Sequence, residues 1–158
     1  GRDVCSYTPE GRKRIHDMLG CNTILMHEIM RIPTLTDSIE LSDNRLSLFS
    51  AQEGKCAVSG VEFTRADKII CHHKHPKKWG GSDRYRNLIL VTENVELLIN
   101  TYKNEEVKTL LIKANITEEA QIEKLNKLRK QSHRKPIDAQ TKEIISKGLA
   151  KETKTAFN

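Results

Sequence analysis

The chain has few aromatic residues and no long hydrophobic run. Only 4% of its 158 residues are Phe, Trp or Tyr, and 37% are hydrophobic, which predicts a small core beneath an extended polar surface. No apolar stretch approaches the ~20 residues that a membrane-spanning helix needs, and the first residues lack the apolar segment of a signal peptide. We therefore expect a soluble, cytoplasmic protein that makes no membrane contact.

Cysteines are also few and far apart. The four of them, Cys5, Cys21, Cys56 and Cys71, form no Cys-x-x-Cys pair. This pattern argues against a zinc knuckle and against a dense disulfide framework. We expect free thiols, with Cys71 packed in a strand.

Acidic residues are outnumbered by basic ones. There are 27 Lys and Arg against 21 Asp and Glu, which gives a net charge of +6 and a pI near 9.2. Most of the excess lies in residues 101–158, which carry 13 basic against 8 acidic residues. This balance favours a polyanionic partner such as DNA, although a solvated charged surface explains basic runs of this kind about as well.

Two helices are predicted in the first third of the chain. Thr8, followed by Pro9, predicts a helix that ends at Gly20, because a hydroxyl cap and a proline are typical of the first helical turn. Ser42 predicts a second helix of about three turns that ends at Gly54.

The centre of the chain predicts a strand, a loop, a strand and a helix in that order. Residues 68–72 and 87–91 have the composition of strands, and a Gly-Gly turn at 80–83 lies between them. Thr92 then begins a helix. The buried side of that helix would be Val95, Leu98, Ile99 and Tyr102.

A last helix is predicted to begin near Thr117. Apolar residues recur there at three-residue spacing and lysines cover the remaining surface, which indicates an amphipathic basic helix. Its apolar residues are Ile122, Leu125 and Leu128. From residue 131 onward the polar composition and Pro136 indicate a docked tail or disorder.

Two adjacent histidines end the first predicted strand, and they indicate phosphodiester cleavage. Hydrolysis of a phosphodiester needs a base that deprotonates water and a cation that offsets the phosphate charge. An unperturbed imidazole, with a pKa of about 6.5, is a competent base at cellular pH, and we assign this role to His73. Neighbouring strand residues point to opposite faces, so His72 and His73 share one site only if the strand twists or breaks there.

Three further residues complete the candidate site. Glu96 and Asn100 are four residues apart and share one helix face, and their oxygens suit Mg²⁺. With His72 they would bind one divalent ion, Mg²⁺ foremost, with Mn²⁺ or another ion also suited. Asn87, at the start of the second strand, would hold the His73 ring or pin the loop. A histidine pair alone can occur by chance, but a histidine pair together with Asn87, Glu96 and Asn100 at these positions is poorly explained by chance.

The loop between the strands supplies candidate contacts to DNA. Basic side chains there would hold phosphates without reading sequence, although a charged, exposed loop is equally consistent with them. These residues are Lys74, Lys77, Lys78, Arg84 and Arg86. His75 is either an extra ligand or a solvent-facing loop residue, and Trp79 either packs the loop onto the helix or stacks on a base.

The run CHHKHPKKWGGSDRYRNLILV, with GKCAVSG before it and NVELLIN after it, resembles the HNH (ββα-metal) nuclease motif. More narrowly, SLFSAQEGKCAVSG through LINTY, then IEKLNKLRK, and the opening YTPEGRKRIHDML are similar to the C-terminal part of bacterial group II intron-encoded reverse transcriptase/maturases. The resemblance implies an α+β fold with a ββα-metal finger flanked by helices. It divides the chain into a helical DNA-binding segment (1–41), the endonuclease (42–114) and a basic helix with a tail (115–158).

The resemblance also implies an activity and a context. The chain would be the part of a mobile-element protein that nicks the target DNA strand, associated with the bacterial nucleoid and with intron RNA through the parent ribonucleoprotein. By position, His73 matches the general base, His72 a metal ligand and Asn87 the middle residue of the motif. Glu96 and Asn100 stand where these proteins usually have histidines, so two readings stay open: an active oxygen-rich site, or a DNA-binding module that keeps only the scaffold.

Two more points follow from the resemblance. Cys56 stands where many relatives have the first cysteine of a zinc-binding pair, but Ser59 stands in the place of the second. A four-ligand structural zinc site is therefore not expected. A freestanding HNH nuclease, with no link to a reverse transcriptase, is a further alternative.

Overall fold

The computed structural model describes residues 24–25, 28–29 and 38–137. It contains helices and a two-stranded antiparallel sheet, so the expected α+β class is confirmed. The main elements are α2 (Ile39–Ala51), β1 (Ile69–His73), β2 (Leu88–Thr92), α3 (Glu93–Asn100), α4 (Asn104–Lys113) and α5 (Glu119–Gln131), with short 3-10 turns at Ala66–Lys68, Lys77–Trp79 and Tyr85–Asn87. The helix expected between Thr8 and Gly20 lies outside the described residues.

The helix α2 begins four residues before the expected position. The Ser38 hydroxyl accepts a hydrogen bond from the Leu41 N–H at 3.0 Å, so Ser38 is the N-cap. The prediction of a cap at Ser42 was therefore wrong, because an equally suitable hydroxyl lies one turn earlier. Asn44, within the helix, donates instead to the backbone carbonyl of Asp83.

The two strands form a hairpin in which each strand lies one residue later than predicted. Ile69 pairs with Thr92 and His73 with Leu88. Shifts of one residue are ordinary at strand ends, and the predicted order of strand, loop, strand and helix is confirmed. The register matters because it makes His73 the last residue of β1, directly before the loop.

The helix α3 follows β2 directly and is capped by Thr92, whose hydroxyl accepts from the Val95 N–H. Val95, Leu98 and Ile99 are fully buried, as predicted. The prediction that Tyr102 shares this buried side was wrong: α3 ends at Asn100, and Tyr102 is 77% exposed. The chain leaves the helix at an extended Thr101, so helical spacing no longer applies.

The helix α4 was not predicted, whereas α5 was. The N-cap residue of α4, Lys103, makes no capping hydrogen bond, so the start of α4 carries no cap signal. The start of α5 does carry one, since Glu118 and Gln121 form a reciprocal capping box. Its predicted apolar residues are all buried: Ile122, Leu125 and Leu128.

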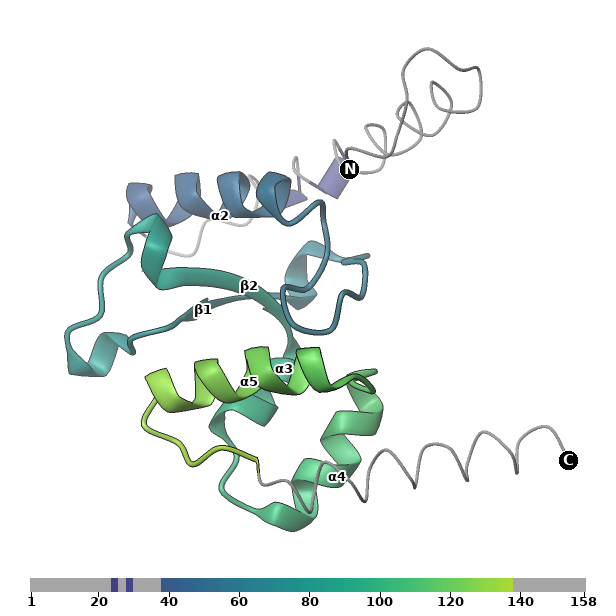
Figure 1. Ribbon diagram of the computed structural model, residues 1–158. Helices are drawn as coiled ribbons and strands as arrows, with labels where there is room; N and C mark the ends of the chain where they lie inside the picture. The colour runs from purple at the N-terminus through teal and green to yellow at the C-terminus, as the bar shows by residue number, and fades with distance from the viewer. Residues whose placement is uncertain (1–23, 26–27, 30–37, 138–158) are drawn as a thin grey trace, which may run out of the picture.

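The hairpin lies between two groups of helices. Figure 1 shows α2 on one side of the strands and α3, α4 and α5 on the other. One hydrophobic cluster joins residues from both groups to β2, and its completely buried members include Phe49, Leu90, Leu98, Leu111 and Leu125. The core thus fixes α3 against the strands and so sets the distance between β1 and the polar residues of α3.

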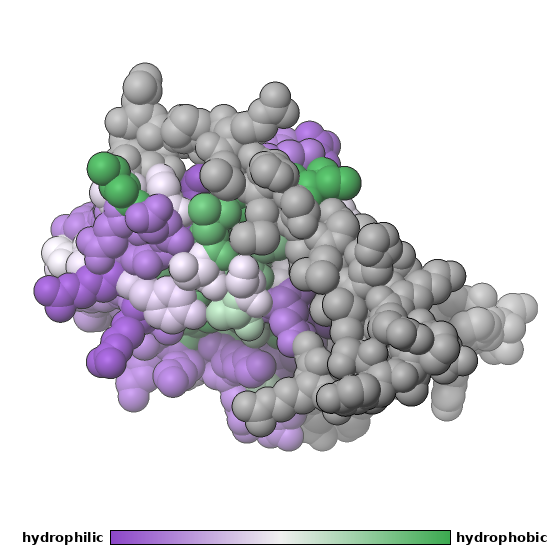
Figure 2. Space-filling model, turned by 90° about the horizontal axis from the view of Figure 1, so that it is seen from above, coloured by the Kyte–Doolittle hydropathy of each residue, from purple (hydrophilic) through white to green (hydrophobic). Residues whose placement is uncertain are grey.

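The described part of the face seen in Figure 2 is mainly polar. This view, from above Figure 1, shows hydrophilic residues over most of the described surface, with hydrophobic residues in separate places. Among the exposed large hydrophobic residues, Ile39 in α2 is 83% exposed. None of the helices that the structure describes is both long enough and apolar enough to span a membrane.

Candidate active site

A cavity of about 290 Å³ lies where the end of β1 faces α3. Residues from four parts of the chain line it: the last residues of β1, the loop at 76–79, one face of α3 and the turn after α5. They are Cys71, His72, His73, Pro76, Lys77, Lys78, Trp79, Glu96, Asn100, Ser132 and Arg134. Both histidines of the pair therefore border one pocket, with His73 as the last residue of β1.

The buried histidine of the pair faces α3. His72 is 5% exposed, and its Nδ1 lies 2.9 Å from Oε2 of Glu96. The contact is an ion pair when the ring is protonated. The other ring nitrogen, Nε2, is buried without a hydrogen-bond partner among the described residues. A buried polar atom of this kind is costly unless a ligand or water satisfies it.

Glu96 is held in its charged form. Burial alone would raise its pKa, but the nearby His72 ring, the Asn100 amide and the His73 ring together lower it. Asn100 donates its amide N–H groups to Oε1 of Glu96 at 3.0 Å and to the Glu96 backbone carbonyl. The carboxylate is thus ionised and oriented by its neighbour one helical turn away.

These residues fit a divalent cation. Adjacent ligand atoms around an octahedral ion with bonds of about 2.1 Å lie about 3 Å apart, which matches the contact between His72 and Glu96. Within the described parts of the chain no three His, Cys, Asp or Glu side chains gather into a metal site. Asn100, with an amide oxygen, is therefore the third protein group beside this pair that could act as a ligand.

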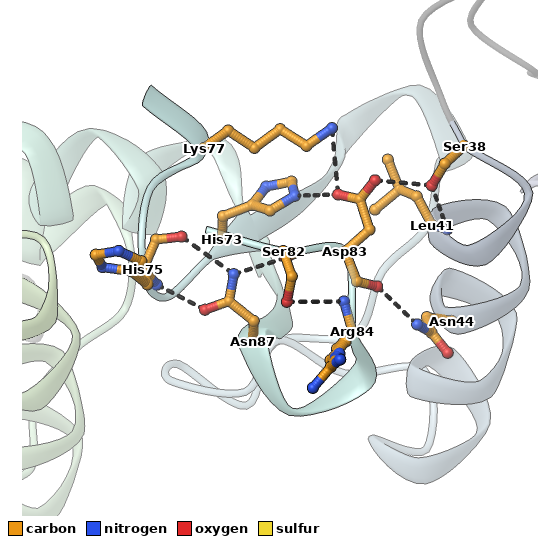
Figure 3. Close-up of polar contacts among 10 residues, drawn as sticks. All are labelled: Ser38, Leu41, Asn44, His73, His75, Lys77, Ser82, Asp83, Arg84 and Asn87. Carbon is orange, nitrogen blue, oxygen red and sulfur yellow. Dashed lines mark hydrogen bonds and ion pairs between the residues drawn. The ribbon is translucent and has the colours of Figure 1, made fainter. Parts of the chain in front are cut away.

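The second histidine of the pair faces a different partner. His73 Nε2 lies 2.7 Å from Oδ1 of Asp83, in the loop (Figure 3). Because an ionised carboxylate only accepts hydrogen bonds, Nε2 carries the proton and a neutral His73 ring keeps its lone pair on Nδ1. A base whose second nitrogen is held by a carboxylate is a recurrent arrangement in hydrolytic enzymes.

Asp83 is itself held from three directions. Ser38, at the start of α2, donates its hydroxyl to Oδ2 at 2.7 Å, and Lys77 approaches Oδ1 at 3.2 Å (Figure 3). The hydrogen bond from His73, with those from Ser38 and Lys77, lowers the pKa of Asp83 to about 2. The Gly-Gly-Ser-Asp run predicts only a turn, so Asp83 is not among the site residues expected from the sequence.

Asn87 pins the loop and does not touch the His73 ring. Its amide nitrogen donates to the carbonyls of His75 and Ser82, and its amide oxygen accepts from the His75 N–H (Figure 3). Of the two predicted roles, the structure has the one that fixes the loop. Gly81 lies so close to the His75 carbonyl that any Cβ there would clash with backbone, which explains the second glycine of the turn.

Of the five basic loop candidates, two line the pocket and three do not. Lys77 and Lys78 line it, with Lys78 also over the Trp79 ring at 4.5 Å, whereas Arg84 and Arg86 are exposed and lie outside its lining. Lys74 is half-buried, and its backbone N–H bonds to the Asn87 carbonyl.

His75 and Trp79 differ in position: Trp79 lines the pocket and His75 does not. His75 is exposed and its ring bonds to the Trp79 carbonyl, so it lies outside the pocket lining. The ring centroids of Trp79 and His133, after α5, lie 4.6 Å apart with the ring planes nearly perpendicular. The loop therefore packs against the turn after α5.

Two lining residues, Ser132 and Arg134, have no counterpart among the predicted site residues, because nothing in the local sequence links the turn after α5 to β1.

Comparisons with protein-family models, with curated proteins and with solved structures find no match to this chain.

Proposed function

We propose that the protein is a divalent-metal-dependent DNA endonuclease of the HNH type, in which β1, β2 and α3 form the ββα-metal finger. One observation carries the proposal: a single pocket borders a carboxylate-held imidazole, His73 with Asp83, and a buried imidazole beside a half-buried carboxylate, His72 with Glu96. The first pair supplies a base and the second supplies cation ligands.

The proposed reaction is hydrolysis of one phosphodiester bond. His73 Nδ1 takes a proton from a water molecule, the water oxygen attacks phosphorus, and the bond to the 3′ oxygen breaks. The leaving oxygen is protonated by solvent, so one strand is nicked. A divalent ion held by His72 and Glu96, with Asn100 assisting, would offset negative charge on the phosphate and on the leaving oxygen.

DNA is the proposed substrate because the pocket lies among basic residues. Lys77 and Lys78 line it, and Arg84 and Arg86 are exposed on the same loop. With the resemblance to group II intron-encoded proteins, this supports a role in intron mobility, in which the chain cuts one target strand while intron RNA supplies much of the sequence recognition. The reading frame immediately upstream distinguishes this context from a freestanding nuclease.

Plasmid nicking tests the proposal. Metal-free protein should convert supercoiled DNA to open circles only after Mg²⁺ or Mn²⁺ is added. His73→Ala should remove nicking, by 10²-fold or more on the order expected for a general base, and leave DNA affinity nearly unchanged. His75→Ala, a loop histidine outside the pocket lining, is the matched control. Equal cutting by the His73 and His75 variants would exclude His73 as the base.

A non-catalytic DNA-binding scaffold is the second candidate. It is favoured by Asn100, whose amide nitrogen is committed to Glu96 where the resembled proteins have a histidine. Glu96→His separates the two candidates: an active oxygen-rich site keeps or raises its nicking rate when an imidazole is added. A wild-type chain that binds DNA, binds no divalent ion and never nicks would establish the scaffold.

A further inference from the structure

The turn that follows α5 is fastened to the end of α3 by a buried arginine. The Arg129 guanidinium donates from Nη1 to the carbonyls of Leu98 and Thr101, and from Nε to the carbonyl of Lys135. Burial lowers the pKa of Arg129, but a guanidinium stays protonated in proteins. The charged group therefore ties residues 132–135 to the helix that carries Glu96.

Ser132 presents an unpaired hydroxyl to the candidate active site. The residue is 4% exposed, it lines the pocket, and its Oγ has no hydrogen-bond partner among the residues that the structure describes. Its backbone N–H is used in the helix end, where it donates to Leu128 and Arg129. A hydroxyl buried in this way is costly unless something bonds to it.

Arg134 presents a second unpaired donor to the same pocket. Its Nε is buried without a partner in the described part of the chain, and the residue lines the cavity. The guanidinium carbon lies 3.7 Å from the centre of the Tyr102 ring. Stacking of this kind holds the flat face of a guanidinium and leaves its N–H edge for an oxyanion.

The turn also meets the loop on the other wall of the pocket. The backbone at His133 has a φ of 59°, and its ring packs nearly perpendicular to that of Trp79. Ser132 and Arg134, on either side of it, both border the pocket. A hydroxyl and a guanidinium edge beside a cation-ligand pair call for a ligand that accepts hydrogen bonds and carries negative charge.

We propose that Ser132 and Arg134 bind the non-bridging oxygens of the DNA phosphodiester beside His72 and Glu96, so that the turn after α5 completes the active site. This inference rests on the proposed nuclease function. Both residues are substrate-positioning groups: they hold the phosphate, and His73 performs the proton transfer.

The test uses single-turnover nicking and duplex affinity of the full chain. Arg134→Ala should slow nicking about ten- to hundred-fold, the range for losing a hydrogen bond to a charged group, and Ser132→Ala should slow it less. Arg134→Lys, which keeps the charge and the aliphatic stem, should give an intermediate rate. Arg65→Ala removes an exposed arginine paired with Asp67, and Ser50→Ala an exposed serine; these controls should match wild type.

Affinity is measured by fluorescence anisotropy of a short labelled duplex in the His73→Ala background. Adding Arg134→Ala should weaken binding by about ten-fold. If wild type nicks and the Arg134 and Ser132 variants match their controls, the inference is overturned and the nuclease function stands. If wild type never nicks but Arg134→Ala still weakens binding, the function is wrong and the phosphate site stands. A chain that neither nicks nor binds DNA overturns both.

Discussion

At the residue scale, two neighbouring imidazoles have different surroundings. His72 is inside the hairpin and faces a carboxylate of α3, whereas His73 is at the strand end and faces a carboxylate of the loop. Strand alternation separates their ring nitrogens, and the end of β1 at His73 still allows both to border one pocket. Two histidines with different partners at one pocket suit a reaction that needs both a bound cation and a base at one phosphate.

Asp83 should affect both catalysis and acid stability. Its pKa of about 2 lies below the ordinary 3.8, so the stabilisation by its charged form is present above pH 4 and is lost as pH falls toward 2. Asp83→Asn should therefore lower the free energy of unfolding by up to about 2 kcal/mol near neutral pH. This difference in stability from wild type should shrink in acid. Urea unfolding between pH 5 and pH 2.5 measures it.

The catalytic effect of Asp83→Asn is separable from its effect on stability. An asparagine at position 83 can hold the His73 ring in the tautomer that carries its proton on Nδ1. The nicking rate at saturating DNA should therefore fall about 10²-fold, while the DNA concentration that gives half of the maximal rate should change little. Asp83→Glu should recover part of the rate. A constant gap in stability from pH 5 to pH 2.5, with an unchanged nicking rate, would contradict this role.

The sequence could predict part of this site. The closeness of His72 to Glu96 and Asn100 follows from a strand end and a four-residue helical spacing, and the structure brings these residues together. Asp83 could not be found in the same way. Its contact with His73 depends on how a loop of more than ten residues folds, which local patterns do not specify.

At the scale of elements, the loop between the strands is held in place by hydrogen bonds of Asn87. Asn87 ties its two ends together through three hydrogen bonds. Strands, α3 and α5 were predictable because they carry alternation, helical spacing or caps. The helix α4 was not, because Lys103 offers no cap, and the start of α2 was misplaced because Ser38 and Ser42 are equivalent as sequence signals.

Gly81→Ala should be more harmful than a glycine substitution elsewhere in the chain. A Cβ at Gly81 would collide with the His75 and Pro76 backbone, so we expect a loss of about 2 kcal/mol or more and a fall in nicking. Gly60, with φ of +74° and open space around it, is the control, since Gly60→Ala should cost only about 1 kcal/mol of backbone strain. Equal melting temperatures for the two variants would contradict the tight loop.

At the scale of the whole molecule, the pocket depends on segments far apart in the sequence. The hairpin, α3 and the turn after α5 meet there because one hydrophobic core joins them. Such convergence is set by tertiary packing and has no local signature, so Ser132 and Arg134 could not be assigned from spacing. The net charge of +6, in contrast, is evident from composition and indicates the class of partner.

Salt dependence should report the DNA contacts of the basic loop. If the five candidate basic residues each contact a phosphate, the logarithm of affinity should fall against the logarithm of salt with a slope of about −4.5. Arg84→Ala or Arg86→Ala should reduce that slope by about 1, while Arg65→Ala should leave it unchanged. Slopes that are identical for all three variants would place the DNA elsewhere.

Electron paramagnetic resonance can follow the binding of Mn²⁺ to the wild-type chain and to its His72, Glu96 and His75 variants, and shows whether the pocket between β1 and α3 holds a cation. One Mn²⁺ ion should bind per chain. His72→Ala and Glu96→Ala should each reduce the affinity for Mn²⁺ at least about ten-fold, whereas His75→Ala should leave it unchanged. Equal Mn²⁺ binding by the wild-type chain and the His72 variant would contradict a cation site in this pocket, because the ion would then be held elsewhere.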